Sequence, residues 1–156
     1  MMQTTIPVLL TFTATALNGV LVGASLDQSI KQLPARHRIG SIAFSVYSRA
    51  ADLGNGIAWY AFLGVSSALV TIATAVITII AGSTHTLPIF IAAILSVFHS
   101  IATSQAAPTN FRQLKMANDE ASLTAVFNTF ERWQTVRVIF QVLTFVATLW
   151  ALFVQG

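Results

Sequence analysis

The stretch GIAWYAFLGVSSALVTIATAVITIIA, residues 56–81, contains no Asp, Glu, Lys or Arg. A helix needs roughly 20 such residues to cross the hydrocarbon core of a bilayer. Three further apolar runs of this kind lie at residues 6–26, 87–107 and 138–155. We therefore predict a single domain over residues 1–156, an all-α integral membrane bundle of four helices.

The composition is typical of a protein that lies mainly in the lipid bilayer. Hydrophobic residues make up 55% and charged residues 8%, whereas soluble domains carry about 25% charged residues. The net charge of +3 comes without a basic cluster interleaved with aromatic residues, so we exclude a nucleic-acid partner. The absence of cysteine excludes disulfides, thiolate catalysis and iron–sulfur clusters. The first residues lack the pattern of a cleaved signal peptide, which favours a retained first helix.

The distribution of positive charge predicts the orientation. All Lys and Arg residues fall on two long connections, residues 27–41 and 108–123, or on the helix starts that follow them: Lys31, Arg36, Arg38, Arg49, Arg112, Lys115, Arg132 and Arg137. The positive-inside rule places these charged loops in the cytoplasm and both termini outside. We expect helices 2 and 4 to begin in the cytoplasmic interface, because residues 42–56 and 122–137 have apolar residues at helical spacing.

Polar side chains gather in the cytoplasmic half of the predicted bundle. Counting 1.5 Å per residue, Asn18 and His99 each lie on the order of 12 Å inside the ends of their helices. Trp133, Arg137 and Gln141 share one face of the fourth helix, at i, i+4 and i+8. Since such groups avoid lipid, we predict a cavity with a polar floor that opens toward the cytoplasm or the inner leaflet.

Each of these residues also has a structural interpretation. His99 is either a neutral imidazole bonded to a neighbouring helix or a proton-transfer or ligand group. Arg49, Asp52 and Arg137 form either an ion-pair layer at the interface or a substrate site. We place His37 in a solvated basic loop and His85 in the turn. No metal site is expected, since the histidines form no HxxxH or ExxH pair.

One pair of glycines predicts a close helix contact. Gly19 and Gly23 have GxxxG spacing, which lets two membrane helices approach closely. The spacing predicts either a contact inside the bundle, across which Asn18 donates from its amide, or a homo-oligomer.

Three short motifs resemble those of the anthrone oxygenase-like family of small four-helix membrane proteins. They are LPAR at residues 33–36, Pro108-x-Asn110 after the third span, and Trp133-x3-Arg137 at the start of the fourth. The resemblance implies an enzyme that oxidises an anthrone or another aromatic, polyketide-like molecule with molecular oxygen as co-substrate and without a standard redox cofactor.

The resemblance implies roles for the clustered residues. His99 is the expected base, because its unperturbed pKa lies near neutrality. Asp52 is a further expected catalytic residue. Arg137 or Asn55 would stabilise an enolate oxygen. The expected stacking walls and substrate contacts are Trp59, Tyr60, Phe98, Asn18, Gln105, Trp133 and Gln141.

Two other function classes fit the same sequence. In a transport or binding module, Asp52 and His99 would carry protons while a lipophilic molecule crosses. In a structural subunit, the glycine face and the interfacial charges would dock a larger partner. The expected partners are the lipid bilayer and, if the chain is an enzyme or a transporter, a hydrophobic small molecule.

Overall fold

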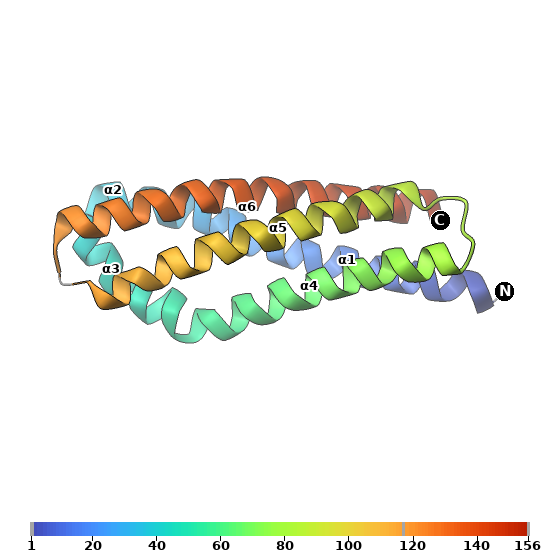
Figure 1. Cartoon of the computed structure of the whole chain (residues 1–156), viewed down its shortest axis with the longest axis horizontal. Helices are drawn as coiled ribbons and strands as arrows, with labels where there is room; N and C mark the ends of the chain where they lie inside the picture. The colour runs from blue at the N-terminus through green and yellow to red at the C-terminus, as the bar shows by residue number, and fades with distance from the viewer. Residues whose placement is uncertain (1, 117, 156) are drawn as a thin grey trace.

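The computed structural model describes residues 2–116 and 118–155, which fold into four helical rods lying side by side (Figure 1). Every regular element in this part of the chain is helical. In chain order the elements are α1 (Met2–Asp27), η1 (Gln28–Gln32), α2 (Leu33–Ile39), α3 (Ser41–Ala50), η2 (Ala51–Asn55), α4 (Gly56–Ile80), α5 (Leu87–Phe111), η3 (Arg112–Lys115) and α6 (Glu120–Gln155).

The predicted all-α bundle of four long apolar helices is confirmed. Each rod contains a segment long and apolar enough to cross a membrane. The chain ends lie at the same end of the bundle as the turn between α4 and α5 (Figure 1). The opposite end carries α2, α3, η3 and the start of α6, with Arg36, Arg38, Arg49, Arg112 and Lys115 on these elements, and we call it the charged end. Arg137 lies midway along α6. That the charged end faces the cytoplasm stays a prediction.

The inside of the bundle is rich in hydroxyl groups, while large apolar side chains cover the outside. Thr11, Thr71 and Thr144 are buried and donate to the carbonyls of Pro7, Ser67 and Phe140 on their own helices. Such bonds satisfy a hydroxyl without an outside partner, and small residues let membrane helices pack closely. This distribution suits a bundle surrounded by lipid.

Most of the two charged connections is helical, where we expected loops: residues 27–39 of the first and residues 108–115 and 120–123 of the second. The first helix continues through η1 and α2 and ends at Gly40, whose φ of +85° stops it. Pro34 lies just after the π-turn η1 and removes one N–H from the helical hydrogen bonds, but the rod continues through it to Ile39. His37 therefore lies exposed on a helix, not in a loop.

The third helix likewise runs on beyond its apolar part. It passes through Pro108 to Phe111 and continues as η3 to Lys115. Buried Thr109 and Asn110 hold this extension against the bundle, and that packing offsets the hydrogen bond lost at the proline.

Side-chain bonds tie the charged end together. Arg36 of the LPAR motif is 2% exposed and donates to Glu131 Oε2 at 2.8 Å and to Asn128 Oδ1 at 2.9 Å. Glu120, the first residue of α6, accepts the backbone N–H of Ser41 at 2.6 Å. The beginnings of α2, α3 and α6 are thereby held in a fixed arrangement.

The second rod changes its helical form in front of its apolar segment. Residues 51–55 form a π-helical turn, and Gly54 leaves the helical region with φ −90° and ψ −111°. π-Turns of this kind are frequent at functional sites. A Cβ at Gly56 would lie 2.7 Å from the carbonyl oxygen of Ala51, so the turn needs a glycine at this position.

We therefore expect Gly56→Ala to destabilise the protein by about 1–3 kcal/mol, because the backbone around the turn must shift. Gly64→Ala on the same helix is the matched control, since a Cβ there meets nothing within 4 Å. It should be neutral or gain up to about 1 kcal/mol of helix propensity. Denaturant unfolding in detergent measures both variants. Equal stabilities would contradict the close approach at Gly56.

Candidate functional site

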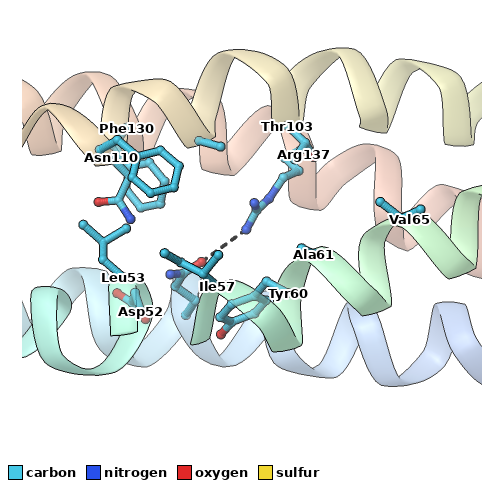
Figure 2. Close-up of a pocket in the computed structure, with 13 residues that line it drawn as sticks. Asp52, Leu53, Ile57, Tyr60, Ala61, Val65, Thr103, Asn110, Phe130 and Arg137 are labelled. Atoms are coloured by element: carbon cyan, nitrogen blue, oxygen red, sulfur yellow. Dashed lines mark hydrogen bonds between the residues drawn. The ribbon is translucent and has the colours of Figure 1, made fainter. Parts of the chain in front are cut away.

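A cavity of ≈ 320 Å³ lies between the helices near the charged end (Figure 2). All four rods contribute residues to this cavity. Its lining residues are Gln28 from η1; Asp52 and Leu53 from η2; Ile57, Tyr60, Ala61 and Val65 from α4; Thr103, Ala107, Asn110 and Phe111 from α5; and Phe130 and Arg137 from α6. Volume and lining are those of a small-molecule site, with mostly apolar walls and a few polar groups.

Arg137 is the cation of the cavity. Its side chain extends from α6 toward η1 and donates from Nη2 to Gln28 Oε1 at 3.2 Å (Figure 2). Its Nε is buried and has no hydrogen-bond partner in the part of the chain that the structure describes. None of the ion pairs among those residues includes Arg137. The guanidinium therefore has donors left for an anionic or carbonyl oxygen.

Asp52 is the acid of the cavity, and a buried network positions it. Its Oδ2 accepts from Ser48 Oγ at 2.9 Å, and Ser48 Oγ in turn accepts from Gln113 Nε2 at 3.2 Å. Gln113 also donates to Asn110 Oδ1 at 2.6 Å and accepts from Ser45 Oγ at 3.0 Å. Since Ser45, Ser48 and Gln113 are all buried, this network fixes the π-turn and its carboxylate against α5.

The ion-pair layer that we considered for Arg49, Asp52 and Arg137 does not form among the described residues. Arg49 instead donates to the backbone carbonyls of Gln113 and Met116. It thus binds carbonyl groups at the end of the third rod, where a cation is favourable. Asp52 and Arg137 both line the cavity without pairing to each other.

His99 lies buried one helical turn from the cavity. Its Nε2 is 2.6 Å from Gln141 Nε2 and 3.2 Å from Thr103 Oγ1. An amide N–H that donates to Nε2 requires a neutral ring with its proton on Nδ1. Thr103 lines the cavity, whereas His99 does not, so any effect of His99 on a bound molecule passes through Thr103.

The other predicted site residues lie at different places. Asn55 and Trp59 are exposed on the outside of the second rod. Phe98 is half-exposed and stacks on Phe140, with 5.4 Å between ring centroids. Gln105 is exposed as well. None of these side chains lines the cavity, because helix rotation, which depth along the chain does not determine, turns them outward.

Two further predicted residues serve the packing of the bundle. Asn18 is buried and donates to Thr71 Oγ1 at 2.9 Å, joining α1 to α4. Trp133 packs against the apolar cluster of the charged end, which includes Leu33 and Phe127. Of the predicted residues, the cavity thus brings together Asp52, Tyr60 and Arg137, with His99 and Gln141 behind Thr103.

The sequence did not predict Gln28 as a cavity residue, because residues 27–41 were expected to form a loop. The helical continuation into η1 turns it inward, where it is 4% exposed. Asn110 was visible only as part of the Pro-x-Asn motif. Gln134 was not predicted to matter, but it is fully buried and bonds Ser29 Oγ at 3.2 Å.

One glycine of the GxxxG pair, Gly19, makes a contact within this chain. A Cβ at Gly19 would lie 3.1 Å from the ring of Phe145, so α1 approaches α6 closely there. Gly23 has open space beside it. A homo-oligomer through this face stays a prediction.

The site offers oxygen and nitrogen donors but no cluster of metal-ligating side chains. No three His, Asp or Glu residues group together within residues 2–116 and 118–155. Comparisons with protein-family models, with curated proteins and with solved structures found no match. What the cavity binds must therefore be argued from its own geometry.

Proposed function

We propose that this chain is a small membrane enzyme that oxidises a hydrophobic aromatic molecule of the anthrone or polyketide type with molecular oxygen. One observation carries the proposal: an apolar cavity at membrane depth holds a carboxylate, Asp52, and an arginine, Arg137, that do not pair with each other. Charged groups at such depth are costly in lipid and mark functional sites.

The chemistry requires little beyond these two groups. An anthrone is planar, apolar and acidic at the carbon between its rings. A base removes one proton from this carbon, and the resulting enolate carbanion adds O₂ to form a peroxide at the same carbon. The peroxide loses its second oxygen atom and the remaining hydrogen of that carbon as water. One anthrone and one O₂ give one anthraquinone and one water, and no cofactor takes part.

Each residue of the cavity has a role in this proposal. Asp52 takes the proton, because it lines the cavity while His99 does not. Arg137 holds the enolate oxygen with its free donors, as preorganised donors stabilise developing charge. Tyr60 and Phe130 provide aromatic walls. His99 acts as a positioning residue through its contact with Thr103.

The test is turnover in detergent, where no proton gradient exists. Purified protein with an anthrone should consume oxygen and form quinone in equal amounts, above the rate of spontaneous oxidation without protein. His99→Ala should lower the rate less than Asp52→Asn does, because only Asp52 reaches the substrate. If uptake into vesicles depends on a gradient and detergent samples show no turnover, the chain is a transporter instead.

A further inference from the structure

We propose that the substrate enters the cavity sideways from the lipid, between α4 and α5, and that Ala61 and Ala107 set the width of this entrance. The identity of the substrate rests on the proposed function above. The opening itself rests on the arrangement of side chains and is tested separately below.

Two facing stripes of side chains border the opening. Ile57, Ala61 and Val65 recur at every fourth residue of α4, and all three line the cavity although they are exposed. Val65 is 59% exposed, and Phe111 at the end of the α5 stripe is 39% exposed. A side chain that both lines a cavity and is exposed marks the place where the cavity opens.

The α5 stripe has the same spacing: Thr103, Ala107 and Phe111 face the cavity at every fourth residue. Figure 1 shows α4 and α5 running side by side from their turn toward the charged end. From Ile57 to Val65 the opening extends about 12 Å along the helix axis. Because this stretch belongs to the apolar part of α4, lipid tails face the opening rather than water.

Buried residues pack at both ends of the cavity along the bundle axis. Toward the charged end lie the buried network of Ser48, Asn110 and Gln113 and the packed rings of Phe44 and Phe127. Toward the turn, a buried cluster of small and apolar residues joins α4, α5 and α6: Ala75, Ile89, Ala92, Ala147 and Ala151. We therefore place the route of a lipophilic molecule at the gap between α4 and α5, where the exposed lining residues lie.

Alanines occupy the middle of both stripes. Ala61 and Ala107 lie between larger residues on their helices, so a flat ring system can pass where a larger side chain would block it. The polar floor suits an aromatic molecule with one acidic oxygen better than a plain acyl chain, since Arg137 offers donors. These two alanines are thus specificity-determining positions.

The first test measures where the opening leads. The chain contains no cysteine, so single Ala61→Cys and Ala107→Cys variants carry one spin label each. In nanodiscs, both labels should be relaxed more strongly by O₂, which concentrates in lipid, than by a water-soluble nickel complex. A label at Lys115→Cys, on the exposed η3, is the aqueous control. Stronger relaxation by nickel at positions 61 and 107 would overturn the lipid entrance.

The second test measures passage of the substrate. Ala61→Phe and Ala107→Phe should raise the KM for a three-ring anthrone at least tenfold, with a smaller effect on a single-ring phenol analogue. Ala58→Phe is the matched control, because Ala58 is exposed on the same helix but does not line the cavity. Unchanged kinetics in the two entrance variants would overturn the proposal.

The two proposals fail in different ways. If wild-type protein does not oxidise the anthrone, the proposed function fails. Binding of anthraquinone, measured by quenching of the protein's tryptophan fluorescence, then replaces turnover in the Ala61→Phe comparison. If native mass spectrometry finds a phospholipid that anthraquinone does not displace, the cavity holds a structural lipid, and the entrance proposal is wrong.

Discussion

Arg137→Gln is expected to lower kcat for anthrone oxidation by about 100- to 1000-fold, the usual cost of removing one donor to a developing oxyanion. The side chain is the cationic group of the cavity. Among the described residues its guanidinium donates to Gln28 alone, which leaves other N–H groups for the substrate oxygen. Steady-state oxygen consumption in detergent measures the effect. Arg132→Gln, an exposed position on the same helix, should leave the rate unchanged.

The same substitution should not destabilise the fold. Among the described residues the guanidinium of Arg137 donates one hydrogen bond, to Gln28, and makes no ion pair, so its loss relieves the cost of desolvating an unpaired charge. We expect Arg137→Gln to unfold at the same or higher temperature than wild type. A large loss of stability together with the loss of activity would instead indicate a structural role for the arginine.

Asp52→Asn is expected to lower kcat by about 100- to 10,000-fold, the range for removal of a general base. Asparagine keeps the size and can still accept from Ser48 Oγ, so the π-turn should persist. Asp52→Glu should recover part of the activity, because a carboxylate is present again but displaced. Exchange of anthrone deuterium with solvent protons in the absence of oxygen measures the rate of proton removal. This rate reports on the base step directly.

The exposed Asp119→Asn serves as the control for Asp52→Asn. It changes a carboxylate at the charged end but outside the cavity, and it should not affect exchange. If Asp52→Asn exchanges deuterium as fast as wild type while His99→Ala does not, the base is His99 and the assignment made here is reversed.

The fold could be predicted from the sequence because four apolar runs without charges have essentially one solution in lipid, where backbone groups must be satisfied within a helix. The charged connections could not be assigned in this way. Their polar composition is typical of loops, but Leu33, Arg36 and Gln113 bury themselves against other rods. This tertiary packing stabilises helices in segments whose polar composition does not predict them.

The site was partly predictable for a related reason. Depth along each helix can be counted from the sequence, so polar side chains of all four helices were predicted to lie in the cytoplasmic half of the bundle. Rotation about the helix axis cannot be counted, and the π-turn at residues 51–55 changes it further. Asn55 and Trp59 therefore turn outward while Asp52 and Tyr60 turn inward.

The most direct test of the account is oxidation of an anthrone under ¹⁸O₂ by wild-type protein and by Arg137→Gln. The account predicts one ¹⁸O atom in each quinone formed by the wild type, at a rate above spontaneous oxidation, and a rate near background for the variant. Quinone formation at the spontaneous rate in both samples would contradict an enzyme centred on the cavity between α4 and α5.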